Sequence, residues 1–238
     1  MMKVVDHYFI FNGKNSLDFG AIIDGNKTFG SAQRDYDSYQ VPGRNGSLTV
    51  DNGRFNEVAL PYEGFIVKDF DDNSEALRNF LQQDVGYHRL EDSIHPDEYR
   101  IAMYPGPFDP KVIFLESGSF TLTFRARPER FLKSGEIPVQ VPAGETVTLL
   151  NPSPQTAKPL IYIPGGTGAV NIGDTILTIT TNTAGMYIDC EIQDAYLNST
   201  NLNQYVQRTT GDFPELRSGR TTISGDMAFE ITPRWWKL

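Results

Sequence analysis

The sequence predicts a mainly β protein with two domains. Apolar and polar residues alternate along many short segments, which is typical of half-buried strands. One stretch has apolar residues at helical spacing instead, and clusters of Gly, Pro, Asn and Ser separate the short segments. We therefore expect a sandwich-like N-terminal domain with one helix and a protruding β-hairpin, followed by a C-terminal β-sandwich.

The clearest strand is FTLTFRAR, which begins at Phe120. Its Phe, Leu, Phe and Ala side chains would face a core, while Arg125 and Arg127 would face outward and are candidate contacts with a partner. Further strands are expected at 4–11, 159–163, 175–180, 186–192 and 227–231, and 48–50 is expected to pair with 55–60.

A single helix is expected at about residues 74–84, in DNSEALRNFLQQDVG. Asp72 or Asn73 would cap the free amides of its first turn, and Gly86 would end it. The preceding acidic residues resemble the carboxylate pair of a glycosidase. Their position before the helix favours an interaction with its dipole instead.

A change of composition near residue 134 predicts a domain boundary. After RPERFLKSGEIPVQVPAGE, Phe nearly disappears and Thr, Asn, Ile and Gly dominate. Turn clusters such as NPSPQ, PGGTG and NIGD then separate short strands, as in a β-sandwich. The predicted domains are residues 1–134 and 135–227.

The stretch GRNGSLTVDNGRFNEVALPY, residues 43–62, contains two Asn-Gly pairs beside arginines. A phosphate-binding loop would lead its glycines into a helix, whereas these lead into strand-like segments. Asn52 and Gly53 suit a two-residue type I′ turn, because both central residues of that turn need a positive φ. Such a turn would pair Asp51 with Arg54 and residue 50 with Phe55.

Asn45 and Gly46 would form a second reversal, preceded by Arg44. The two turns together predict a protruding hairpin, and its turn residues are our candidates for a contact between subunits. These are Arg44, Asn45, Gly46, Asn52, Gly53, Arg54 and Phe55.

Composition excludes several classes of function. The formal net charge of −9 disfavours nucleic-acid binding, which depends on cationic side chains. The single cysteine, Cys190, allows neither an intramolecular disulfide nor a cysteine-based zinc site. It lies in MYIDCEIQ, where alternation with Met186, Ile188 and Ile192 predicts a buried, inert thiol.

Nor does the sequence carry a recognisable catalytic motif. The three histidines are scattered, and no nucleophile elbow, Walker loop or dinucleotide fingerprint is present. We therefore expect no catalytic residues, metal or cofactor. No segment approaches a membrane span and the N-terminus lacks the features of a signal peptide, so we expect synthesis in the cytoplasm.

The tryptophans Trp235 and Trp236 stand next to each other in PRWWKL. Neighbouring residues of a strand point to opposite faces, so one can join a core while the other meets a partner. Both are candidate partner contacts.

Four segments resemble the distal tail proteins of long-tailed phages that infect Gram-positive bacteria. They are YFIFNGKNSLDFGAII at 8–23, VPGRNGSLTVDNGRFNEVALPY at 41–62, FTLTFRARPERFL at 120–132 and GDFPELRSGRTTIS at 211–224. They follow one another in the family's order and span nearly the whole chain.

The resemblance implies a structural virion protein, not an enzyme. Its N-terminal belt domain would form a homohexameric ring, single or stacked as a dodecamer, and residues 228–238 would return to that domain. The second domain would be galectin-like. The hub would join the tail tube and tape measure protein to the tail-associated fibre or lysin protein and to peripheral baseplate or receptor-binding proteins, and leave a channel for DNA.

A carbohydrate-binding module that aids adhesion to the host surface is the alternative. Galectin-type sites use a tryptophan and a histidine-containing cluster. Residues 135–226 contain neither residue type, which argues against that alternative.

Overall fold

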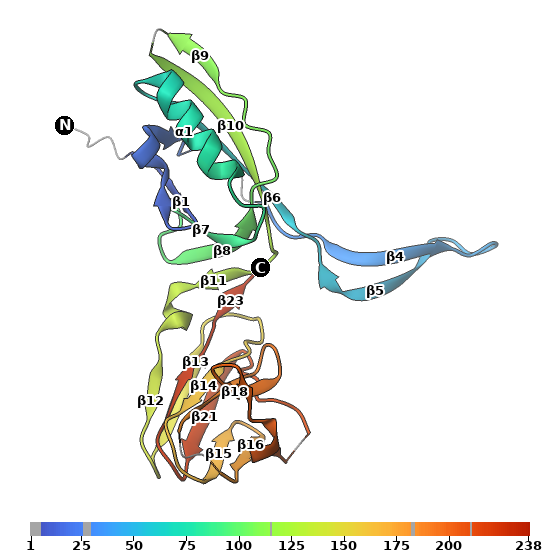
Figure 1. Cartoon of the computed structure of the whole chain (residues 1–238). Coiled ribbons are helices and arrows are strands. Elements are labelled where there is room, and N and C mark those ends of the chain that lie inside the picture. Colours follow the sequence, from blue (N-terminus) through green and yellow to red (C-terminus); the bar gives the residue numbers. More distant parts are fainter. Residues whose placement is uncertain (1–5, 26–29, 115, 182–183, 210) are drawn as a thin grey trace. The chain divides into compact units, whose positions relative to one another are not determined.

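The computed structural model describes residues 6–25, 30–114, 116–181, 184–209 and 211–238 (Figure 1). The chain divides into two compact units: unit 1 comprises Met1–Arg130 with Leu238, and unit 2 comprises Phe131–Lys237. The prediction of a mainly β fold is confirmed. Residues 4 and 5 of the strand expected at 4–11 lie outside the described residues.

Unit 1 is built on an antiparallel sheet with the strand order β2-β1-β7-β8-β10-β6-β3, and β9 also pairs with β10. Its elements are β1 (Phe9–Phe11), β2 (Lys14–Asn15), the 3-10 helix η1 (Ser16–Phe19), β3 (Ala21–Ile23), β6 (Val58–Ile66), β7 (His88–Asp92), β8 (Glu98–Met103), β9 (Lys111–Phe114) and β10 (Ser117–Ala126). The predicted FTLTFRAR strand is confirmed as part of β10, with Phe120, Leu122 and Phe124 buried.

The helix α1 runs over Phe70–Gln82, earlier than the expected 74–84. Asp69 occupies the cap position, with a φ of 45°, and its side chain makes no capping hydrogen bond. Asp72 and Asn73 lie within the helix, so neither of them caps it as expected. Phe70 explains the early start, because its buried ring packs against Gly118 of β10 and fixes the first turn. Leu77 and Leu81 are buried in the same core.

Two strands of unit 1 stand apart from this sheet. β4 (Arg34–Gln40) and β5 (Ser47–Phe55) pair only with each other and form a two-stranded sheet. In Figure 1 they form a long ribbon that extends away from the main sheet.

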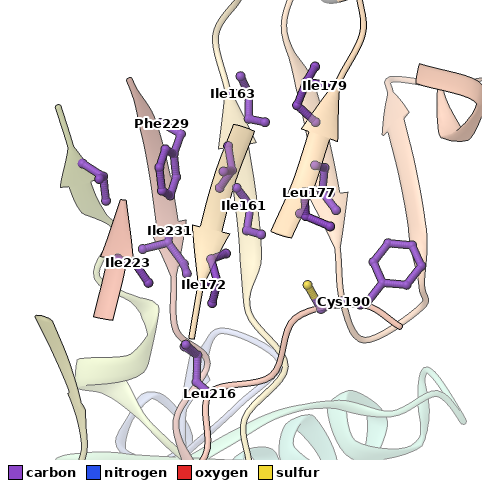
Figure 2. Packing of buried hydrophobic residues seen from close by; sticks show 14 of the residues in the cluster. Ile161, Ile163, Ile172, Leu177, Ile179, Cys190, Leu216, Ile223, Phe229 and Ile231 are labelled. Carbon is purple, nitrogen blue, oxygen red and sulfur yellow. The ribbon is translucent and has the colours of Figure 1, made fainter. Parts of the chain in front are cut away.

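Unit 2 contains two antiparallel sheets around one core. The first has the order β12-β22-β14-β17-β18-β19 and the second β13-β21-β15-β16-β20. Figure 2 shows Ile161 and Ile231 from the first sheet packed with Ile172 and Leu177 from the second. The elements are β11 (Arg130–Leu132), η2 (Lys133–Glu136), β12 (Val139–Val141), β13 (Thr146–Asn151), β14 (Leu160–Ile163), β15 (Gly168–Ile172), β16 (Thr175–Ile179), β17 (Met186–Asp189), β18 (Asp194–Leu197), β19 (Thr200–Asn201), η3 (Asn203–Tyr205), β20 (Val206–Arg208), β21 (Gly219–Gly225), β22 (Phe229–Thr232) and β23 (Trp236–Lys237).

Residues 228–238 were predicted to return to the first domain, but β22 does not. β22 lies between β12 and β14 of unit 2, because Phe229 and Ile231 alternate into the core of that unit. β23 pairs with β11. Only Leu238 is grouped with unit 1, where its carbonyl oxygen accepts a hydrogen bond from Arg130 Nη2 at 2.8 Å.

Cys190 is buried, as predicted, and burial raises the pKa of its thiol to about 12. The expected strand over 186–192 is too long, however. β17 ends at Asp189 and the chain turns, so the alternation stops and Ile192 is exposed.

Candidate assembly surfaces

The ribbon formed by β4 and β5 is solvent-exposed on both faces within this chain. Of its strand residues, only Asp35 and Phe55 are partly buried, and the others are exposed. The two strands are joined at residues 41–46, where Gly43 and Gly46 have positive φ angles of 78° and 82°. The tight reversal expected at Asn45-Gly46 is not seen: the hydrogen-bonded turn lies one step earlier, where the Arg44 amide donates to the carbonyl oxygen of Val41 at 3.2 Å. Arg44, Asn45 and Gly46 complete the loop at the tip.

The turn expected at Asn52-Gly53 is wrong. β5 passes straight through these residues, and the register shifts between Arg34, opposite Phe55, and Tyr36, opposite Asp51. The extra residues of β5 form a β-bulge, in which Gly53 has a φ of 72°. This bulge and a type I′ turn both use a left-handed glycine, so the Asn-Gly pair alone did not distinguish them.

The bulge also changes the ion pairs that sequence reasoning predicted. Arg54 does not pair with Asp51 but contacts Asp35 across the ribbon, with Nε 2.6 Å from Oδ2. Asp51 instead binds Arg34, whose guanidinium lies 4.7 Å from the ring centroid of Phe55. Asn52, Gly53, Arg54 and Phe55 thus lie at the base of the ribbon, far along the strand from the tip residues.

These contacts affect the titration of two carboxyl groups at the base of the ribbon. The hydrogen bond from Arg54 lowers the pKa of Asp35. The pKa of Asp51 is lowered first by the backbone amide of Gly53, which donates to Oδ1 at 2.9 Å, and then by Arg34. Both carboxylates are therefore charged at neutral pH and hold the two strands in register.

One face of the ribbon is apolar, and sequence reasoning missed it. Tyr39 lies opposite Leu48, and Asp37 opposite Val50, so these four side chains share a face. The exposed fractions are 55% for Tyr39, 48% for Leu48 and 46% for Val50. We call this set the hairpin face. The alternation of Leu48 and Val50 with polar residues was the available signal.

The other face of the ribbon is largely polar. Serine, threonine and glutamine side chains occupy it together with Tyr36 and Asp51. The ribbon is therefore amphipathic, although nothing in the described part of unit 1 covers its apolar side.

Arg125 and Arg127 lie on the open side of the main sheet, as expected. Arg125 Nε is 3.5 Å from Glu57 Oε2, and the Arg127 guanidinium lies 5.2 Å from the ring centroid of Tyr87. Arg125 also lines an open groove of about 740 Å³ at the base of the ribbon, together with Arg54 and Phe55. The structure thus brings the base residues of the hairpin together with Arg125, and leaves the tip residues apart.

The two tryptophans belong to unit 2 itself. Trp235 is buried in its core, which contradicts the expectation that it is available to a partner. Trp236 is half-buried and donates from Nε1 to the carbonyl oxygen of Thr156 at 2.9 Å. The adjacent pair therefore anchors the end of the chain to its own unit.

Three tyrosines form a row across the first sheet of unit 2. Tyr162, Tyr187 and Tyr196 lie side by side on β14, β17 and β18. The ring centroids are 4.7 Å and 5.9 Å apart, and the rings are inclined by 34° and 25°. Because the rings face one another, Tyr187 has a neighbouring tyrosine ring on each side.

In the described residues, no helix is long and apolar enough to cross a membrane. No family model matches the chain, and no curated protein matches its sequence.

A solved structure, by contrast, resembles nearly all of it. The Dit protein (gp 19.1) of phage SPP1 is described as a paradigm of hub adsorption apparatus in Gram-positive-infecting phages. It superposes with a TM-score of 0.73 over 94% of this chain and 97% of that chain, at 13% identity. The expected likeness to distal tail proteins is therefore confirmed for the fold.

Proposed function

We propose that the chain is a structural hub protein of a phage tail, which forms a homohexameric ring at the distal end. The observation that carries this proposal is the likeness to the Dit protein of SPP1, because it extends over both units and leaves little of either chain unmatched. A likeness that covers both units supports a common role more strongly than a match to one β-sandwich would.

The hairpin supplies a physical reason for assembly. A two-stranded ribbon is marginally stable in water unless its apolar side is covered. This one exposes Tyr39, Leu48 and Val50, and burying a side chain of this size contributes up to roughly 1.5–3 kcal/mol. A neighbouring copy that covers the hairpin face would stabilise the ribbon and the ring together.

A ring also determines the kind of contact. Closed rings of more than two copies need a heterologous interface, in which one surface of a subunit meets a different surface of the next. A ribbon that extends from the sheet suits one side of such an interface. Two rings stacked on each other would give a dodecamer.

The ring would act as a connector in the virion. One side would meet the tail tube and the tape measure protein, and the other the tail-associated fibre or lysin protein, with peripheral baseplate or receptor-binding proteins around it. This role requires no catalytic residue and leaves a central channel for DNA.

The charge of the chain suits such a channel. A net charge of −9 repels DNA and gives it no attractive site along the way. The open side of the main sheet is nevertheless mixed in sign, because Glu63 lies there with Arg125 and Arg127. We expect no specific DNA binding at moderate salt, which filter binding would measure.

Light scattering and negative-stain microscopy of the purified protein test the proposal. We expect a mass of six or twelve subunits and rings with an open centre. The double variant Leu48→Ser, Val50→Ser should remain folded by circular dichroism but lose the rings. Tyr36→Ser, on the opposite face of the ribbon, is the matched control and should keep them. A wild-type protein that stays monomeric at high concentration would refute the proposed function.

A further inference from the structure

Unit 1 contains a cavity of about 260 Å³ on the core side of its main sheet. Its lining includes the buried side chains of Leu60, Tyr62 and Leu90 together with the charged side chains of Asp92 and Arg100. These residues come from the strands β6, β7 and β8. Charges held against apolar walls interact more strongly than charges in water.

The Nη1 atom of Arg100 is buried and has no hydrogen-bond partner among the described residues. Burial, followed by repulsion from the nearby Arg130, lowers the pKa of the Arg100 guanidinium. A buried charge without a counter-ion is costly, because it has lost its hydration and gained no partner. Arg100 therefore needs an acceptor that carries a negative charge.

The carboxylates near Arg100 are already engaged with other groups. Asp92 Oδ2 accepts the hydroxyl of Tyr62 at 2.8 Å, and its Oδ1 accepts two backbone amides of the turn that follows. Glu98 Oε2 lies 3.6 Å from Arg130 Nη1. Asp92 and Glu98 both raise the pKa of Arg100, but by less than burial and Arg130 lower it.

We propose that this cavity binds a small oxyanion of the phosphate type on the guanidinium of Arg100. A guanidinium is planar and can donate two parallel hydrogen bonds to such a ligand. A water molecule would accept the free N–H group but would leave the positive charge uncompensated. The site goes beyond the proposed ring and does not depend on it.

The size of the cavity limits the ligand. A volume of about 260 Å³ lies below the roughly 300–1,000 Å³ of sites that hold drug-sized molecules. A single inorganic anion with some water fits this space, whereas a nucleotide or an oligosaccharide does not.

Isothermal titration calorimetry with inorganic phosphate tests the site at pH 7 and constant ionic strength. The wild-type chain should bind one phosphate in a saturable manner. Arg100→Gln removes the charge and the paired donors, and should weaken binding by about tenfold or more. Arg217→Gln is the matched control, because the Arg217 side chain lies in unit 2 and is 78% exposed, and it should bind like the wild type.

Thermal unfolding provides a second measurement. In chloride buffer, Arg100→Met should unfold at the same temperature as the wild type or higher, because an apolar side chain replaces an unpaired buried charge. Exchanging chloride for about 100 mM phosphate should raise the midpoint of the wild type by about 3 °C more than that of Arg100→Met. This difference removes the general stabilising effect of phosphate on folded proteins.

Several outcomes would overturn the site. They are the absence of saturable binding to the wild type, equal binding by Arg100→Gln, and equal effects of phosphate on the wild type and Arg100→Met. Tighter binding of acetate than of phosphate would show that the cavity takes a carboxylate instead. A wild type that binds phosphate but forms no rings would leave the site standing and refute the proposed function.

Discussion

Arg234 holds Asp189 with two parallel hydrogen bonds, from Nη1 to Oδ1 at 2.7 Å and from Nη2 to Oδ2 at 2.9 Å. Asp189 ends β17, and Arg234 lies between β22 and β23 with a φ of 57°. Asp189 Oδ1 also accepts the backbone amide of Glu191 at 2.9 Å. The Arg234–Asp189 ion pair therefore connects the turn after β17 to the segment between β22 and β23. That segment leads to the buried Trp235.

The Asp189–Arg234 pair should make unit 2 sensitive to acid. Burial raises the pKa of Asp189, but the hydrogen bonds from Arg234 and from Glu191 outweigh it, and the net pKa lies below its usual value. A carboxyl group whose pKa is lower in the folded than in the unfolded state stabilises the folded protein. This stability is fully present at pH values above the unfolded-state pKa of about 3.9, and it is lost as the pH falls through the folded-state pKa. Urea unfolding between pH 7 and pH 2.5 should show this loss.

Asp189→Asn should lower the free energy of unfolding by about 2 kcal/mol at pH 7, because it removes a charged partner of a half-buried arginine. It should also flatten the acid-dependent part of the profile. Asp174→Asn is the control, since the Asp174 side chain is 95% exposed and lies 4.0 Å from Arg217. A pH profile of Asp189→Asn that follows the wild type would show that the pair does not contribute.

Gly64→Ala should destabilise unit 1 severely. A methyl group on Gly64 would lie 2.3 Å from the carbonyl oxygen of Ile22 and 2.7 Å from the ring of Phe120. The first contact is with backbone of the paired strand β3, which cannot move without breaking the sheet. We expect a loss of about 3 kcal/mol in urea unfolding.

Gly30→Ala is the matched control for that change. The added methyl group would lie 3.6 Å from Val58 Cγ1, an ordinary contact, and this glycine has no left-handed φ. It should leave stability within about 0.5 kcal/mol of the wild type. Equal stability of the two variants would contradict the close approach of β3 and β6.

The Cys190 thiol should be unreactive in the folded protein. Its pKa of about 12, against an ordinary value of 9.0, reduces the thiolate fraction at neutral pH by about a thousandfold, and burial restricts access as well. A thiol-specific chromogenic reagent should therefore react at the rate of unfolding. Rapid reaction of one thiol per chain in native buffer would contradict this burial.

Alternation was sufficient to predict elements whose two sides differ in burial. β10 follows this rule, because Phe120, Leu122 and Phe124 pack inward while the threonines between them stay in water. The helix was predicted from apolar residues at helical spacing, of which Leu77 and Leu81 are buried, but its start was not predicted. The tertiary contact of Phe70 with β10 fixes that start, and no local signal reports it.

The candidate surfaces were harder to predict, for two physical reasons. Gly53 has a positive φ, which would suit a turn as well as a bulge. Which of the two forms is decided by the pairing of β5 with β4, and the local sequence does not report that pairing. Sequence reasoning therefore favoured turn residues and missed Tyr39, which alternation alone does not place beside Leu48. The row of tyrosines in unit 2 comes from three strands and is likewise visible only after pairing.

Substitutions at Gly53 distinguish the bulge from an ordinary strand residue. With a φ of 72° and no atom within 4 Å of an added Cβ, the cost at this position comes from backbone strain alone. A left-handed β-branched residue costs about 1–2 kcal/mol, and asparagine less. Gly53→Val should therefore speed amide hydrogen exchange in β5 by about fivefold or more, and Gly53→Asn should have a smaller effect. Exchange in β6 should be unchanged in both variants, because the ribbon is a separate sheet. Equal effects of valine and asparagine would mean that Gly53 is not left-handed in solution.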